Sequence, residues 1–537
     1  MKKIDKIVIV GGGSAGWMTA ATLIKAFPSK DISVIESKDV PTVGVGESTI
    51  GGIRTWTRFI GLNESTFFSE TDASLKLSIK FTDFYKKDGG AFHYPFGSPM
   101  SINEGNPFFQ WQLKKYFYPD TPNEDFVRCI FPAAALFENN KFSMNENGEF
   151  DNFNPDNDVA YHFDATKFGV WLKKNYCIPR GIRHIEATVT NSVCDADGIS
   201  YLELDNGQHV SADLFIDCTG FKSLLLGNAL NEPFDSFSEM LPNNKAWATR
   251  LEYKDKEKEL EGFTNCTALG NGWSWNIPLW SRLGTGYVYS DKFVSPEQAK
   301  EEFKNYLMSD KMIVPRTQEE VDKLEFKDIN MRVGIHQRTF VKNVVAIGLS
   351  AGFIEPLESN GLFSVHEFLF KLIDILQRER VSEFDRYMYN TSVRELFDTF
   401  ARFVALHYAL SHRDDTDYWK NINKKDFASS LPYKTNETTD AFYNMHWRYM
   451  TEWGHPMGPA GITYIATGMN VNMFNEARMM NMQYRVPTNL NEEADQCYIV
   501  WENDKEKWNK NAESAESLYN FLSNSFYGGD FNFYEDK

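Results

Sequence analysis

Three glycines near the N-terminus have the spacing of a loop that holds phosphate groups. The motif GGGSAG at 11–16 matches G-x-G-x-x-G through Gly11, Gly13 and Gly16. In this pattern the first glycine permits a tight turn, the second lets backbone N–H groups approach a pyrophosphate, and the third lets a helix pack closely on a strand. Glu36 follows twenty residues after Gly16, where a carboxylate can accept hydrogen bonds from ribose hydroxyls. These residues predict a dinucleotide site.

Two lysines and two histidines carry groups that could act in catalysis, but their local patterns do not decide it. Over residues 75–82 apolar and polar side chains alternate. This predicts a strand with Lys76 and Lys80 on one polar face, about 13 Å apart at about 3.3 Å per residue. On this pattern alone, two solvated lysines are the expected arrangement. His93 and His407 are expected to make packing and hydrogen-bond contacts rather than to act in catalysis.

The glycine turn needs a strand before it and a helix after it, and the sequence has both. Residues 7–10 (IVIV) are a short apolar run typical of a buried strand, and residues 17–27 have helical spacing. Residues 31–36 (DISVIE) predict a second strand that ends at Glu36. This β-α-β order is the Rossmann unit, in which the motif binds FAD or NAD. The glycine pattern does not separate the two cofactors.

Two later segments have the form of buried strands that run into turns. They are residues 209–220 (HVSADLFIDCTG) and residues 342–348 (KNVVAIG), and the second leads into a long helical pattern at 361–380. After about residue 385 the patterns are mostly helical. We therefore expect a discontinuous nucleotide-binding α/β domain with an interleaved sheet at 1–385, and a mostly helical region at 386–537.

Composition and charge argue against several other classes of protein. The net charge of −18 argues against a nucleic-acid partner and against an anionic membrane surface. The six cysteines form no CxxC or Cys/His cluster, so neither a metal site nor a disulfide framework is predicted. No run of about 18 apolar residues could span a bilayer, and the N-terminal apolar run is a strand rather than a signal peptide. We expect a cytoplasmic protein without a membrane partner.

Several motifs together resemble the flavin-dependent tryptophan halogenases. GGGSAGWMTA at 11–20 and GVGEST at 44–49 are similar to the N-terminal signature of that family. GWSWNIP at 272–278 carries a W-x-W-x-I-P pattern that ordinary flavin hydroxylases lack. The residues of that pattern are Trp273, Trp275, Ile277 and Pro278. Further matches are YHFDA at 161–165, EPLESNG at 355–361 and SHRDDTDYW at 411–419.

The resemblance implies an α/β fold of the FAD-binding aromatic-hydroxylase type, with a Rossmann-type βαβ unit, an interleaved sheet and a helical C-terminal part that caps the substrate. It favours FAD, because DLFIDCTG at 213–220 and VVAIGLSAGFIEPLESNG at 344–361 look like flavin-contacting segments of FAD-dependent hydroxylases. The positions expected at the cofactor are Gly11, Gly13, Ser14, Ala15, Gly16, Glu36, Gly46, Glu47, Gly348 and Leu357.

The resemblance also implies a reaction in two places. FAD, supplied reduced by a separate flavin reductase, would use dioxygen and a halide ion (chloride, bromide or iodide) to make hypohalous acid. This would pass through a tunnel near the W-x-W-x-I-P motif to Lys76, which would direct electrophilic halogenation of an electron-rich aromatic small molecule. Glu358 would stabilise the ring cation and take its proton. The halide would lie at Ser359, Asn360 and Gly361.

Two other functions stay open on the sequence. A flavin-dependent aromatic hydroxylase would add oxygen and would need neither Lys76 nor a halide. A non-catalytic, redox-responsive flavoprotein would have no use for Lys76 and Glu358. At position 360 Asn stands where the family usually has Thr, and GPAGITYIATGMN at 458–470 lacks the family's tryptophan, so the motifs do not name the substrate. A homo-oligomer is left open.

Overall fold

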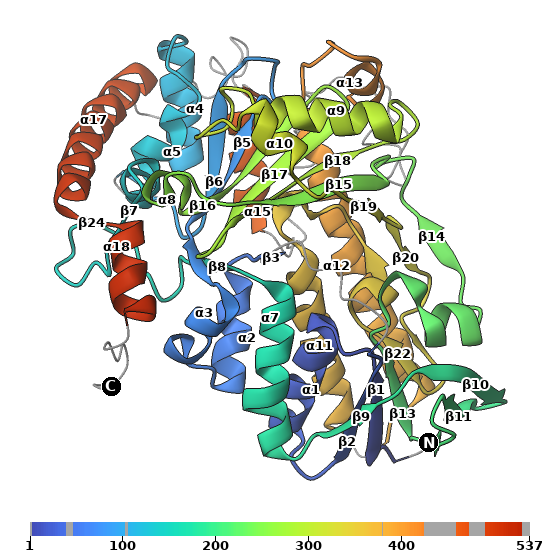
Figure 1. Cartoon of the computed structure of the whole chain (residues 1–537). Helices are drawn as coiled ribbons and strands as arrows, with labels where there is room; N and C mark the ends of the chain where they lie inside the picture. The colour runs from blue at the N-terminus through green and yellow to red at the C-terminus, as the bar shows by residue number, and fades with distance from the viewer. Residues whose placement is uncertain are drawn as a thin grey trace.

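The computed structural model describes residues 3–38, 47–102, 106–378, 380–423, 458–471 and 489–528. In Figure 1 a six-stranded sheet occupies the lower part of the molecule and a seven-stranded sheet the upper part, with helices around both. The α-helices of the first half are α1 (Ser14–Ala26), α2 (Gly52–Ile60), α3 (Glu64–Thr71), α4 (Pro107–Phe117), α5 (Asp125–Ile130), α6 (Ala133–Glu138), α7 (Ala165–Trp171) and α8 (Lys256–Glu259). Those of the second half are α9 (Pro296–Leu307), α10 (Gln318–Asp322), α11 (Gly361–Leu376), α12 (Glu383–Ala409), α13 (Asp417–Ile422), α15 (Gly458–Gly468), α17 (Leu490–Ser514) and α18 (Leu518–Leu522).

The six-stranded sheet confirms the predicted β-α-β unit. Its strands, in spatial order, are β21 (Phe340–Val341), β22 (Val344–Ala346), β13 (Leu214–Asp217), β1 (Lys6–Val10), β2 (Asp31–Glu36) and β9 (Arg183–Glu186). All neighbours are parallel except β21 and β22. The carboxyl ends of β1, β13 and β22 therefore meet at one edge, where α/β sheets bind their ligands.

The seven-stranded sheet is almost wholly antiparallel. Its strands, in spatial order, are β19 (Lys327–Asn330), β15 (Lys245–Leu251), β18 (Leu283–Tyr289), β17 (Gly272–Pro278), β16 (Phe263–Leu269), β5 (Ser78–Thr82) and β6 (Ala91–Pro95). Only β16 and β5 run parallel. Every residue of β17 and β18 is buried. Helices α9 and α10 lie over one face of this sheet in Figure 1, and Trp273, Trp275 and Ile277 join the main hydrophobic core on the other.

Smaller sheets complete the described structure. Their strands are β3 (Glu47–Ser48), β8 (Ala160–Phe163) and β4 (Ser74–Lys76); β10 (Val189–Asp195), β11 (Gly198–Leu204) and β12 (His209–Val210); β14 (Phe234–Ser236), β20 (Gly334–His336) and β23 (Gly352–Phe353); and β7 (Lys141–Phe142) with β24 (Glu516–Ser517). The sheet of β3, β8 and β4 lies between the two large sheets in Figure 1.

The prediction of one continuous strand over 75–82 is wrong, because the chain changes sheets at Leu77. β4 pairs with β8, whereas β5 pairs with β16 and β6. The backbone of Leu77 bonds to Gly262 and Phe96 instead of continuing either ladder. Lys76 is consequently fully buried, and only Lys80 is partly exposed, so the expectation of two solvated lysines is wrong for Lys76.

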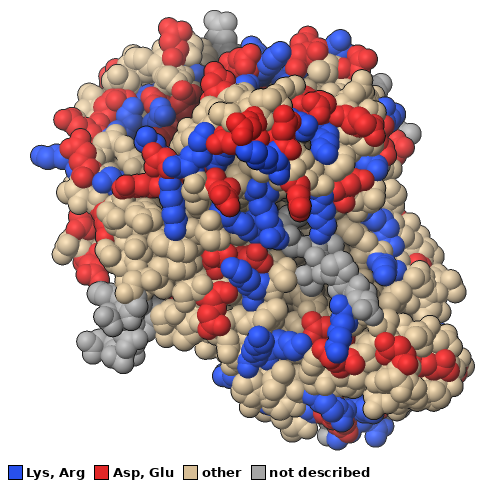
Figure 2. Space-filling model, viewed as in Figure 1, with Lys and Arg blue, Asp and Glu red and all other residues tan. Residues whose placement is uncertain are grey.

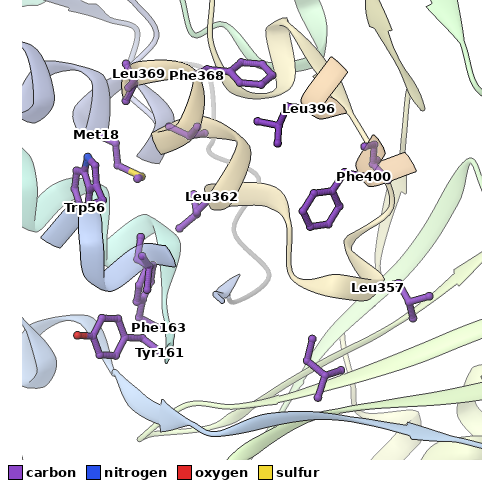
Figure 3. Close-up of a cluster of buried hydrophobic side chains, with 14 of the residues drawn as sticks. Met18, Trp56, Tyr161, Phe163, Leu357, Leu362, Phe368, Leu369, Leu396 and Phe400 are labelled. Atoms are coloured by element: carbon purple, nitrogen blue, oxygen red, sulfur yellow. The ribbon is translucent and has the colours of Figure 1, made fainter. Parts of the chain in front are cut away.

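Helix α11 packs between helices α1 and α2 on one side and helix α12 on the other. It confirms the helical pattern predicted from Gly361, although it ends at Leu376 rather than at residue 380. Helix α12, which starts at a capping box formed by Ser382 and Asp385, packs beside it. Figure 3 shows side chains from α1, α2 and β8 on one side of α11 and from α12 on the other. The labelled ones include Met18, Trp56, Tyr161 and Phe163 on the first side, Leu396 and Phe400 on the second, and Leu362 on α11 itself. Each fully buried side chain of this size stabilises the fold by about 1.5–3 kcal/mol.

The C-terminal region is helical apart from β24 in its described residues. The predicted domain boundary at residue 385 falls inside α12, and side chains from both sides of it share one hydrophobic cluster. Among the described residues, no helix is both long and apolar enough to cross a bilayer, and no cluster of His, Cys, Asp and Glu could hold a metal ion. Acidic and basic side chains are interspersed on the face seen in Figure 2.

Candidate active site

The glycine turn at the end of β1 leaves room only for backbone. Gly11 has a φ of +115°, and a Cβ there would lie 2.2 Å from the carbonyl oxygen of Cys218. A Cβ on Gly16 would lie 1.9 Å from the carbonyl oxygen of Gly11. Helix α1 begins at Ser14 without a side-chain cap or an acidic residue in its first turn. Its free N–H groups and positive dipole end suit a pyrophosphate, so the turn fits a dinucleotide.

The other residues expected at the cofactor lie around this turn where they are described. Glu36 lies beside Gly12, and its Oε2 is 2.7 Å from Lys173 Nζ and 2.9 Å from His184 Nε2. Gly348, with a φ of +73°, brings the end of β22 against Ala15. The carboxylate that is expected to face a ribose is therefore already paired with Lys173 and His184.

The remaining cofactor predictions fall on positions of different kinds. Gly46 lies outside the described residues, and only the backbone of Glu47 is described, in β3. Leu357 is fully buried in the short 3-10 turn Pro356–Glu358, and its carbonyl faces the thiol of Cys266 at 3.8 Å. These three positions stay predictions for FAD binding.

Lys76 ends in a pocket of neutral oxygen atoms. Its Nζ donates to the hydroxyl of Ser359 at 2.8 Å and to the carbonyl of Thr49 at 2.9 Å, and it lies 5.3 Å from the ring centre of Phe96. Burial lowers the pKa of this ammonium to about 7, although the nearby Cys266 and Glu358 act in the opposite direction. An uncharged amine is therefore accessible near neutral pH.

Glu358 lies next to Ser359 in the chain and is also buried, with 1% of its surface exposed. Its Oε1 is 2.7 Å from His407 Nε2. The other ring nitrogen, Nδ1, lies 3.1 Å from the carbonyl of Phe403, which can only accept, so Nδ1 carries a proton. The imidazole and the carboxylate thus form a close buried pair. His407 was expected to make packing and hydrogen-bond contacts, and its pairing with Glu358 could not be read from the sequence.

The start of α11 has unused hydrogen-bonding capacity. The hydrogen-bonding groups of Ser359 have partners within the protein: its N–H donates to the carbonyl of Pro356, and its hydroxyl accepts from Lys76 and donates to Ser48. Asn360 and Gly361 form the N-terminus of α11, which has no side-chain cap. The Oδ1 of Asn360 is buried and without a partner among the described residues. Backbone N–H groups here could hold an anion through the helix dipole.

The W-x-W-x-I-P motif forms β17. Trp273 donates from its indole N–H to Glu355 at 2.8 Å, and Asn243 and Tyr408 donate to the same carboxylate oxygen. Trp275 packs against the backbone of Gly286, with its ring centre 6.2 Å from that of Trp273. Ile277 and Pro278 continue the buried strand. Glu355 therefore ties the segment that carries Glu358 to the seven-stranded sheet, a connection that the sequence did not disclose.

The structure combines a glycine turn at a parallel sheet with a buried lysine and a buried carboxylate beside a second, antiparallel sheet. Comparison with known proteins identifies this combination as a flavin-dependent oxidoreductase of the halogenase class. The family model described as tryptophan halogenase matches residues 6–468. The chain belongs to this family.

Individual relatives agree with that assignment. The chain is 34% identical over 448 residues to the tryptophan 6-halogenase SttH of Streptomyces toxytricini, which covers 80% of this chain and 82% of that protein. It is 34% identical over 447 residues to the tryptophan 7-halogenase RebH of Lentzea aerocolonigenes, covering 80% and 81%. The solved structure of VirX1 without ligands superposes with a TM-score of 0.88 at 34% identity, covering 98% of this chain and all of that one. The predicted family, fold class and enzyme class are confirmed.

Proposed function

We propose that this flavin-dependent halogenase transfers halogen to an electron-rich aromatic small molecule, with Lys76 carrying the electrophilic halogen and Glu358 taking the ring proton. The observation that carries the proposal is the setting of Lys76. Its ammonium is buried among neutral oxygens, and burial brings its pKa to about 7. A solvated lysine with a pKa near 10.4 would be about 0.04% amine at pH 7, too little to serve as a nucleophile.

The glycine turn fits FAD, and the groups described there suggest how it would be held. Gly11, Gly13 and Gly16 keep side chains away from the pyrophosphate, and Glu36 stands where the ribose hydroxyls would lie. The bound flavin, supplied reduced by a separate flavin reductase, provides the oxidation of halide by dioxygen to hypohalous acid. Chloride, bromide or iodide would accept hydrogen bonds from the backbone N–H groups of Asn360 and Gly361 at the start of α11.

Glu358 and His407 supply a route for the ring proton. An aromatic ring that has taken up a halogen cation must lose a proton to recover aromaticity, and a carboxylate close to the ring both stabilises that cation and accepts the proton. Aromatic side chains lie near this carboxylate. Burial, and then the charge of Glu358, raise the pKa of Tyr94 well above its usual value. The ring of Tyr94 lies 5.4 Å from that of Tyr464 and 6.2 Å from that of Phe403. These rings favour an aromatic substrate.

The proposal is tested with purified enzyme, FAD, a flavin reductase and a panel of indoles, phenols and pyrroles that includes free tryptophan, on which SttH and RebH act by name. Chloride, bromide and iodide are supplied in turn, and products are read by isotope pattern in the mass spectrum. We expect halogenated product with wild type, at least a hundred-fold less with Lys76→Ala, and a smaller loss with Glu358→Gln.

FAD binding and the release of oxidant serve as controls. Both variants should bind FAD as wild type does, and hypohalous acid released to solution should still be trapped with Lys76→Ala. Product that gains oxygen instead of halogen would make the enzyme a hydroxylase. Undiminished halogenation by Lys76→Ala would overturn the role of Lys76.

A further inference from the structure

A row of buried hydroxyl groups leads away from Lys76 to a histidine. Lys76 Nζ lies 2.8 Å from Ser359 Oγ, which lies 3.0 Å from Ser48 Oγ. Ser48 Oγ lies 2.6 Å from Thr264 Oγ1, which in turn lies 2.9 Å from His162 Nε2. None of the five residues has more than 6% of its surface exposed. The row is unbroken and has hydrogen-bonding distances throughout.

The far end of the row determines the direction of every hydrogen bond in it. Ser74 Oγ donates its one proton to the carbonyl of Pro278 at 2.6 Å. It can therefore only accept from His162 Nδ1, 3.3 Å away, so Nδ1 carries the imidazole proton and Nε2 has a lone pair. Nε2 then accepts from Thr264, and each preceding hydroxyl has one proton to pass in the same direction. From Lys76 to His162 all donors point the same way.

Five separate segments bring these groups together. In the sheet of β3, β8 and β4, Ser48 and Ser74 both pair with His162 on the central strand, while Thr264 comes from β16. Ser359 holds its hydroxyl in place from a left-handed backbone with φ 56° and ψ 34°. A residue other than glycine keeps this conformation only where the surroundings impose it.

Among the described residues, few charged or titratable groups lie near the row. Lys76 interacts with Cys266, Glu358 and His162. Burial, and then the charge of Lys76, lower the pKa of His162 well below its usual value, so the imidazole is neutral at rest; the second of these causes disappears when the proton leaves Lys76. Among the described residues, the side-chain partners of His162 are the hydroxyls of Ser74 and Thr264 rather than a carboxylate. The histidine is thus a proton acceptor connected to solvent-remote Lys76 by hydroxyls alone.

We propose that His162 receives, through Thr264, Ser48 and Ser359, the proton that the Lys76 ammonium must lose before it can take up halogen. This inference rests on the proposed function of Lys76. The ammonium gives a proton to Ser359, each hydroxyl passes its own proton onward, and His162 becomes an imidazolium that keeps its Nδ1 proton on Ser74.

The lysine then reacts as a free amine. When the Ser359 hydroxyl turns away from Nζ, the lone pair of the amine is free, while Thr264 and Ser48 keep the reversed direction because Nε2 of the imidazolium now donates to Thr264. This lone pair attacks the halogen of hypohalous acid, so that an N–X bond forms as the X–O bond breaks, and the departing hydroxide takes one amine proton to leave as water. The proton first lost from the ammonium remains on His162, so the step is balanced without another reactant.

The experiment compares halogenation by wild type, Ser48→Ala and His162→Gln between pH 6 and pH 9, with the complete enzyme, FAD, reductase and bromide. Ser48→Ala interrupts the row, and His162→Gln keeps a hydrogen-bonding side chain that cannot take a proton. We expect both to lose at least ten-fold in rate at pH 6, where Lys76 is an ammonium, and to approach wild type by pH 9, where it is already an amine. Ser48→Thr, which restores a hydroxyl, should recover most of the loss at pH 6.

The matched control is His336→Gln, which removes another buried histidine bonded to a serine hydroxyl, Ser223, at 3.2 Å and outside the row. It should show the wild-type pH profile. FAD content and trapped hypohalous acid are measured for every variant. Equal losses at all pH values, or none at pH 6, would overturn the relay while leaving the role of Lys76 intact. Halogenation by Lys76→Ala would instead overturn the proposed function.

Discussion

The replacement of Lys76 by Met tests whether its charge is destabilised by burial. Met has similar length, no charge and no donor, so Lys76→Met removes the titration together with two pH-independent hydrogen bonds. Between about pH 7 and pH 10.5 the folded protein holds Lys76 as an amine, whereas the unfolded chain holds it as an ammonium. The unfolded state then binds one more proton, so the free energy of unfolding of wild type rises with pH through this window.

The size of the effect follows from the two pKa values. A fall from 10.5 to about 7 corresponds to about 5 kcal/mol of destabilisation at low pH. Within the window the penalty shrinks by about 1.4 kcal/mol per pH unit. About half of Lys76 is still ionised at pH 7. With this allowance, the difference in free energy of unfolding between Lys76→Met and wild type should decrease by about 2 kcal/mol from pH 7 to pH 9.

Urea unfolding at pH 6, 7, 8 and 9 measures this difference, since groups common to both proteins cancel. The lost hydrogen bonds shift the two stability curves by a constant and leave their relative slope unchanged. Parallel curves across the whole range would refute the reasoning, because they would mean that Lys76 has an ordinary pKa in the folded protein. We expect the free energy of unfolding of wild type to rise relative to that of Lys76→Met as pH increases.

Two further substitutions test the frame of the site. Gly11→Ala would place a Cβ 2.2 Å from the carbonyl of Cys218 at a φ of +115°, so we expect the purified variant to have lost bound FAD, read from its flavin absorbance. Trp273→Phe removes one of three donors from the buried carboxylate of Glu355, and urea unfolding should show a loss of about 2 kcal/mol.

The nucleotide-binding half of the fold could be predicted from the sequence because its signals are local. The apolar run at 7–10, the glycine turn and the strand at 31–36 lie within thirty residues of one another. Each has a period or a steric requirement that acts over a few residues. The strands at 214–217 and 344–346 were also predicted, since a strand buried on both faces is continuously apolar.

The interior of the catalytic half could not be predicted in the same way. The alternation over residues 75–82 correctly indicated extended chain, but alternation cannot show that the chain leaves one sheet for another at Leu77. That change is what buries Lys76. Likewise, nothing in the local sequence around His162 or Thr264 indicates that they share a hydrogen bond, because 102 residues separate them in the chain.

Lys76 differs from the buried Arg316 because it forms no direct ion pair with a carboxylate among the described residues. Arg316 is buried and forms an ion pair with Glu259, which neutralises it. Lys76 has a carboxylate close enough to affect its pKa, yet that carboxylate, Glu358, directs an oxygen to His407 at 2.7 Å. Among the described residues Lys76 is left with hydrogen bonds to neutral oxygens only. A direct ion pair would hold Lys76 as an ammonium, which has no lone pair for halogen. His407 therefore acts on the lysine through Glu358: by occupying the carboxylate, it leaves burial as the dominant influence on the pKa of Lys76.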